Sequence, residues 1–271
     1  MNRRIYPAIA MSLAFGALLG ASSSTGAVPQ SAVAVPQSAV SVAPSTTAVE
    51  PQALQALMRM SIYLSTLPAF EVKTDTTLDL VTMRGQRLQL GGTAEYKVRR
   101  PSGFQIAVNT DFMSRRFYFD GKQFTVLAPK LNYYSTEPAP ATNREMVDVL
   151  YSKYGIALPL ADLFRWSDPE SARAEKLTSA FLVGPVTLDG VVTDHYAFRE
   201  ADQDWEIWID RGNKPLPRKI AIVSKRDSAR PAYVAHLTWN VAPNLRADDF
   251  TYKPTTASKQ IHIAEIDKNQ G

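Results

Sequence analysis

The chain has 271 residues, of which 45% are hydrophobic and 21% charged, and its formal net charge is +4. A charge so close to balance argues against a nucleic-acid partner, because such proteins normally carry a clustered basic face. The chain contains no cysteine, which excludes disulfides, thiol catalysis and the lipid-modified cysteine of a lipoprotein.

The first 27 residues have the layout of a secretory signal peptide. Two arginines precede an apolar stretch over 8–20, and Thr25 and Ala27 occupy the small-residue positions of a cleavage site before Val28. The alternative is an uncleaved membrane anchor, but an anchor needs about 20 apolar residues and this stretch is shorter. We therefore expect residues 1–27 to be removed on export to the periplasm.

The next segment, 28–49, is rich in Ala, Val, Pro and Ser and contains the sequence VPQSAV twice. Few of its residues can build a core, so it is predicted to be a disordered spacer. A single folded domain is expected over 50–254, because no shift of composition divides it. Residues 255–271 are expected to form a C-terminal tail.

The folded domain is predicted to open with a helix that begins at Pro51 and ends before Pro68. Apolar residues recur in it at spacings near three and four and are expected to form its buried face. They are Leu54, Leu57, Met58, Ile62 and Leu64.

Beyond this helix the apolar period changes to two, which predicts strands over 70–80, 88–98 and 104–108. The pair Gly91-Gly92 lies inside the second strand and indicates a β-bulge. Two further strands, 117–119 and 124–126, flank Asp120-Gly121, which is a strong hairpin signal.

The middle of the chain is predicted to be helical. Thr142 with Glu145 three residues later is a capping box, and Gly155 marks the end of that helix. A short apolar helix is expected over 160–166 and another brief helix over 167–174.

The chain then returns to strands, with turns at Asp189-Gly190 and at 211–213. The strands are expected over 181–188, 191–199, 205–210, 218–225 and 233–241, and Phe250 and Tyr252 are expected to add a last short one. The pattern predicts a mainly β fold with α (α+β). Its ten or eleven strands would form a single antiparallel sheet that curls toward a barrel.

Seven short motifs, in this order, resemble a family of predicted periplasmic bacterial proteins of unknown function. They are RPSGF (100–104), YFDGK (118–122), LNYYSTEPAPAT (131–142), YGIALPLADL (154–163), DHYAFR (194–199), DWEIWID (204–210) and PLPRKI (215–220). That family is in turn similar to the LolA/LolB group of lipoprotein carriers. The resemblance implies a curved half-barrel with helices that lid its concave side, and an acyl chain held in that concave space.

Side chains that could carry catalysis do not form a recognised motif. His195, His236 and His262 lie on separate segments without the spacing of a zinc site, and no serine occurs in a G-x-S-x-G sequence. Neither a metal nor a cofactor is expected.

The stretch 204–210 offers one enzymatic reading. Asp204, Glu206 and Asp210 fall on one face of a strand, as the paired carboxylates of a glycoside hydrolase would. The alternative is the polar outer face of a strand whose other face carries Trp205, Ile207 and Ile209, and we favour that alternative.

Basic pairs stand at three predicted strand ends: Arg99-Arg100, Arg115-Arg116 and Lys225-Arg226. They are either solvated turns or contacts for anionic lipid head groups.

Apolar residues of the mid-chain helices are expected to line a ligand site: Leu150, Tyr154, Leu160, Leu163, Phe164 and Trp166. The sequence thus predicts a monomeric periplasmic protein, not an enzyme, that holds a lipid or acyl chain on the concave side of its sheet. The alternative is an interaction or sensor module of the cell envelope, with a filled interior and a protein partner.

Overall fold

The computed structural model describes residues 49–158, 160–161 and 176–266. In this part of the chain twelve strands form one sheet, in the order β12-β6-β5-β4-β3-β2-β1-β11-β10-β9-β8-β7. The strands are β1 (Ala69–Val81), β2 (Arg87–Arg99), β3 (Phe104–Thr110), β4 (Ser114–Phe119), β5 (Gln123–Ala128), β6 (Tyr133–Pro138), β7 (Ser179–Leu188), β8 (Val191–Arg199), β9 (Gln203–Asp210), β10 (Pro217–Ser224), β11 (Ala232–Asn240) and β12 (Lys259–Gln260). The pairings are antiparallel except that β12 runs parallel to β6, so the predicted fold class is confirmed.

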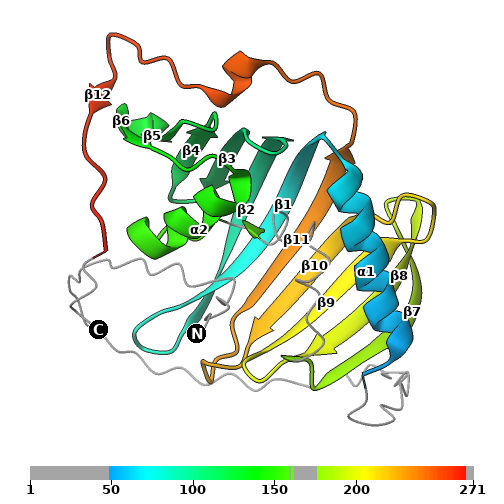
Figure 1. The fold of residues 1–271 in the computed structure, drawn as a ribbon. Helices are drawn as coiled ribbons and strands as arrows, with labels where there is room; N and C mark the ends of the chain where they lie inside the picture. Colours follow the sequence, from blue (N-terminus) through cyan, green and yellow to red (C-terminus); the bar gives the residue numbers. More distant parts are fainter. Residues whose placement is uncertain (1–48, 159, 162–175, 267–271) are drawn as a thin grey trace.

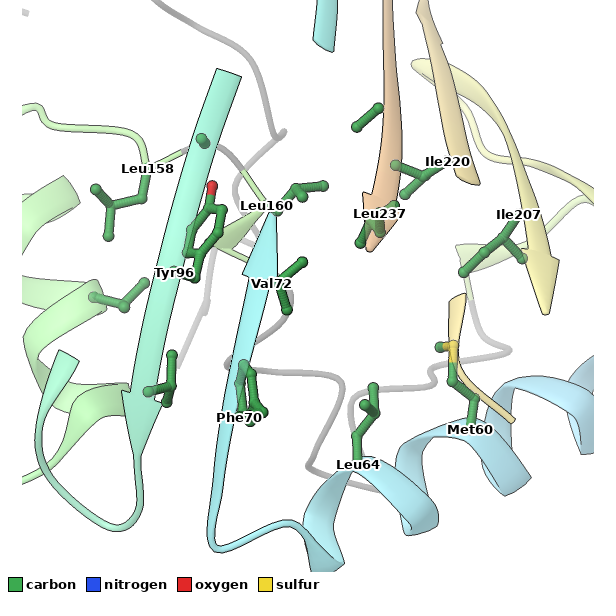
Figure 2. Packing of buried hydrophobic residues seen from close by; sticks show 14 of the residues in the cluster. Met60, Leu64, Phe70, Val72, Tyr96, Leu158, Leu160, Ile207, Ile220 and Leu237 are labelled. Carbon is green, nitrogen blue, oxygen red and sulfur yellow. The ribbon is translucent and has the colours of Figure 1, made fainter. Parts of the chain in front are cut away.

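Two α-helices, α1 (Pro51–Thr66) and α2 (Asn143–Tyr154), lie against the curved sheet (Figure 1). Side chains directly opposite one another across antiparallel strands share a face. One row on the inner face runs Phe70, Val98, Phe104, Phe119 and Phe124, and another runs Tyr233, Ile222, Trp205, Phe198 and Ala180. Both helices contribute to the same core cluster as these rows, and Figure 2 shows Met60 and Leu64 of α1 within it.

Helix α1 begins and ends where the sequence predicts, with Pro51 in its first turn and Leu67 as its C-cap. Its predicted buried face is partly wrong, because Met58 and Ile62 are 49% and 50% exposed. The buried residues are Ala53, Ala56, Leu57, Met60, Ser61 and Leu64. Ala53 and Ala56 are 0% and 1% exposed, and a prediction from the spacing of large apolar residues passes over such small side chains.

Strand β2 runs straight through Gly91-Gly92, so the predicted bulge is wrong. Its register with β1 is unbroken from the pair of Ala69 and Arg99 to the pair of Val81 and Arg87. A Cβ atom on Gly92 would lie 3.0 Å from both the Asn109 carbonyl oxygen and the Thr76 hydroxyl. The glycine therefore serves the close approach of curved neighbouring strands.

The hairpins and the middle helix form largely as predicted. The Asp120 amide donates to the Gln123 carbonyl, so the central turn residues are Gly121 and Lys122, one position later than expected. Thr142 and Glu145 form the capping box of α2, and Gly155 ends the helix with a φ of 66°. The short helices expected over 160–166 and 167–174 lie mainly outside the described residues.

The C-terminal segment differs from its prediction. Phe250 lies in a 3₁₀ turn, η5 (Ala247–Phe250), and not in a strand; another 3₁₀ turn, η1 (Pro129–Leu131), precedes β6. The Phe250 ring is buried, and the Arg99 guanidinium lies 4.6 Å from its centroid. Strands β6 and β12 were not predicted, because their sequences show little apolar alternation. No helix in the described ranges is long and apolar enough to cross a bilayer.

Candidate ligand-binding site

The structure places the predicted site residues in different environments. Leu150 on α2 is fully buried and Leu160 is 5% exposed, and both belong to the core cluster beneath α2. Tyr154 is half-buried, with the Lys153 ammonium 5.1 Å from its ring centroid. Leu163, Phe164 and Trp166 lie outside the described residues.

A cleft of about 530 Å³ opens on the other side of the molecule, between α1 and the sheet end where β10 begins. Its floor contains Ala56, Tyr196 and Ile209, three members of the buried core. Ile62 forms an apolar part of its wall. None of the three predicted site residues that the structure describes, Leu150, Tyr154 and Leu160, lines it. Sequence reasoning missed the cleft because its walls come from α1, β8 and the loop after β9, which only the fold brings together.

Polar side chains surround the cleft: Arg59 and Tyr63 from α1, Asp194 from β8 and Arg211 from the loop. An Asp194 carboxylate oxygen, Oδ1, lies 3.1 Å from Arg211 Nε, but the two atoms are not aligned as a hydrogen bond. The pKa of Tyr196 is raised, chiefly by burial and next by the Asp194 charge. Arg59 and Arg211 oppose that increase. The cleft is therefore apolar at its floor and charged at its rim.

Three buried polar atoms on different elements of the described structure have no hydrogen-bond partner: Ser61 Oγ on α1, Asp194 Oδ1 on β8 and Tyr233 Oη on β11. Ser61 lies on the buried face of α1, and Asp194 and Tyr233 are cross-strand neighbours of the inner-face residues Ile209 and Ile222. Burial raises the pKa of Tyr233, which keeps its hydroxyl protonated as a donor. Proteins pair most buried polar atoms, and an unpaired one costs about 1–3 kcal/mol.

The carboxylates of β9 lie on the outer face, opposite Trp205, Ile207 and Ile209, as the alternation predicts. Each contacts at least one basic side chain. Asp204 contacts Arg199 at 2.8 Å, Glu206 contacts His195 at 2.7 Å, and Asp210 contacts Arg218 at 2.8 Å. This arrangement is a row of carboxylates that basic side chains engage, and not two free carboxylates facing a substrate.

The three histidines do not come together. His195 stacks on Trp208 with ring centroids 4.0 Å apart, and Lys219 Nζ lies 4.6 Å from the same indole. His236 on β11 lies opposite Lys219 on β10, and His262 follows β12. Within the described ranges, no group of three or more potential metal ligands forms.

Comparison with protein families gives a match over residues 53–264 to a family described as "Predicted periplasmic protein (DUF2092)". This confirms the family resemblance predicted from the seven motifs. No curated protein matches the chain significantly.

Several solved structures are similar. Lipoprotein LppX from Mycobacterium tuberculosis shows 14% identity over 73% of this chain and 100% of its own, with a TM-score of 0.46. LprF from Mycobacterium bovis shows 13% identity over 78% and 99%, with a TM-score of 0.46. A LolA superfamily protein from Nitrosomonas europaea shows 9% identity over 74% and 97%, with a TM-score of 0.31. At 9–14% sequence identity the similarity concerns the fold and not the molecules bound.

Proposed function

The chain belongs to the DUF2092 family of predicted periplasmic proteins, and we propose that it binds an apolar or amphiphilic ligand, a lipid or acyl chain, between its helices and the concave face of its sheet. The observation that carries this proposal is the cleft beside α1. Its floor consists of core residues and its rim of charged and phenolic groups, which matches a ligand with an apolar tail and a polar end.

The size and lining of the cleft support this assignment. A volume of about 530 Å³ lies within the roughly 300–1,000 Å³ of typical small-molecule sites, which are mostly apolar with a few placed polar groups. Arg59 and Tyr63, which line the cleft, can each donate to an ester or carboxylate oxygen. A ligand that enters beneath α1 would satisfy such groups and keep the surrounding core dry.

The α2 side supplies a second apolar wall in this proposal, separate from the cleft. Leu150 and Leu160 are buried in the same cluster as the cleft floor, and Tyr154 is half-buried beside them. Leu163, Phe164 and Trp166 stay sequence-based members of this wall.

Substitutions on α1 test the cleft directly. Ile62 lines it and is 50% exposed, so Ile62→Asp should leave the fold intact while placing a charge against the ligand tail. We expect at least a tenfold loss of affinity for a fluorescent fatty-acid analogue. Met58→Asp is the matched control, because Met58 is 49% exposed on the same helix and does not line the cleft.

The identity of the ligand requires the natural protein. Native mass spectrometry of the protein recovered from a periplasmic extract should show an added mass, and solvent extraction should release a lipid. If no acyl probe binds the folded protein and no mass is added, the ligand-binding proposal is wrong.

A second candidate function is favoured by one observation. Met58 and Ile62 lie one turn apart on the exposed side of α1, where apolar side chains suit contact with a protein partner. If the protein is a cell-envelope sensor, both Met58→Asp and Ile62→Asp should weaken binding of the protein partner. If it binds a ligand in the cleft, only Ile62→Asp of these two variants should weaken binding.

A further inference from the structure

The β1–β2 hairpin extends beyond the strands on either side of it. β1 and β2 pair as far as Val81 and Arg87, but β3 pairs with β2 only from Gly92 and β11 pairs with β1 only as far as Leu78. The end of the hairpin therefore projects as a two-stranded arm, seen as the long curved loop in Figure 1. Two strands alone are marginally stable in water, so an exposed arm of this kind benefits from a surface to lie on.

Large apolar side chains are exposed at this end of the sheet. Met83, at the hairpin turn, is 102% exposed, and Phe112, in the β3–β4 turn, is 74% exposed. These are the two highest values for large apolar residues in the part of the chain that the structure describes. The β3–β4 turn is tied to the base of the arm, because the Asp111 carboxylate accepts a hydrogen bond from the Gly91 amide of β2 at 3.1 Å.

Four arginines accompany these residues: Arg84, Arg87, Arg115 and Arg116. Arg87 lies 3.6 Å from Asp79, but the other three form no ion pair with any described residue. The one carboxylate of the two turns, Asp111, is already engaged by a backbone amide. Residues 82–88 and 110–116, called the arm surface below, thus combine exposed apolar tips with an excess of positive charge, because they contain four arginines and one carboxylate.

We propose that the arm surface docks on a bilayer that contains anionic phospholipid, with Met83 and Phe112 entering the interfacial region and the arginines contacting phosphates. Isolated apolar side chains flanked by arginines suit the head-group region of a bilayer, where each side chain can insert to a different depth. The arm surface consists of protruding turns. A protein partner would need a complementary concave surface to contact them, whereas a bilayer would not. This inference does not depend on the ligand proposed above, because the cleft lies at the opposite end of the sheet, where β10 begins.

Vesicle co-sedimentation of the protein recovered from a periplasmic extract tests the inference. The protein should bind vesicles of mixed phosphatidylglycerol and phosphatidylcholine, should not bind pure phosphatidylcholine vesicles, and should bind less as ionic strength rises. Arg84→Gln with Arg116→Gln should weaken binding by at least tenfold, because each basic residue near an anionic surface contributes about fivefold. Met83→Ser with Phe112→Ser should weaken it at least as much.

The matched control is Lys214→Gln with Val192→Ser, which removes one exposed basic and one exposed apolar side chain at the opposite end of the sheet, where neither lines the cleft. It should bind vesicles as the unchanged protein does. The inference is wrong if the unchanged protein ignores anionic vesicles, or if the arm variants bind normally while melting normally. It is also wrong if sedimentation velocity shows that the arm variants abolish a dimer instead, since the arm would then contact a second copy.

Discussion

Asp204 on the outer face of β9 is surrounded by three basic side chains. Its carboxylate lies 2.8 Å from Arg199 Nε, 3.3 Å from Lys225 Nζ and 3.1 Å from Arg230 Nη2. Partial burial disfavours its ionised form, but the hydrogen bonds from Arg199 and Lys225 outweigh that effect and lower its pKa. The sequence does not reveal this cluster, because Arg199, Lys225 and Arg230 come from three segments that only the sheet brings together.

The lowered pKa makes Asp204 a pH-dependent source of stability. A carboxyl whose pKa is lower in the folded state stabilises the fold above its unfolded pKa, near 3.9, and loses that contribution as pH falls through the folded pKa. Asp204→Asn should cost about 1 kcal/mol of unfolding free energy at pH 7, and the difference from the unchanged protein should shrink below about pH 4. Urea unfolding at several pH values measures both.

Glu95→Gln is the control for this prediction. Glu95 pairs with Lys73 at 3.8 Å, but both side chains are more than half exposed, so its loss should have little effect at any pH. If the loss of unfolding free energy in Asp204→Asn stays constant down to pH 3, the charge of Asp204 does not contribute to stability.

At the scale of elements, the segment after Pro254 covers an edge of the sheet. Lys259 and Ile261 amides donate to the Asn132 and Tyr134 carbonyls, and the Ile266 amide donates to the Lys153 carbonyl at 2.8 Å. Lys153 also pairs with Glu265 at 2.9 Å. Strand β6 would otherwise present unpaired backbone groups, which promote association between edges.

Truncation after Pro254 tests the role of this segment. Without β12 and the residues that follow it, we expect the unfolding free energy to fall by about 2 kcal/mol, since several backbone hydrogen bonds are lost. We also expect concentration-dependent aggregation through β6. Thermal melts and light scattering measure the two effects, and an unchanged melt without aggregation would show that residues 255–271 are a tail without a structural role.

The other edge of the sheet is treated differently. The Glu50 amide donates to the Ala180 carbonyl at 2.8 Å, and the Glu50 carboxylate accepts from the Leu182 amide. Beyond that point β7 contains Pro185, which has no amide hydrogen to offer a further strand. The β6 edge is thus covered by β12, and further pairing at the β7 edge is limited by Glu50 and Pro185.

At the scale of the whole molecule, export remains a prediction from the N-terminal sequence. The periplasmic protein should begin between about residues 21 and 30, because a signal peptidase cleaves after small residues such as Thr25 and Ala27. N-terminal sequencing of a periplasmic fraction checks this. Recovery of the intact N-terminus in a membrane fraction would favour the anchor instead.

Local signals determined much of the fold. Alternation from Phe70 to Leu80 and from Trp205 to Asp210 assigned strands and their faces, and the Thr142 capping box and Gly155 set the ends of α2. These features depend on residues within a few positions of one another, so their physics is present in the sequence. The single antiparallel sheet followed from the number of such strands and their short connections.

The tertiary structure alone decided the features that depend on long-range contact. The burial of Ala53 and Ala56 depends on which face α1 turns toward the sheet. Gly92 is required by the approach of Thr76 and Asn109 on the neighbouring strands. Strand β6 forms along β5, and the short β12 forms along the other edge of β6, although neither β6 nor β12 shows strong apolar alternation. The cleft exists because α1, β8 and the loop after β9 converge. Sequence patterns report the neighbours along a chain, whereas a site is made by neighbours in space.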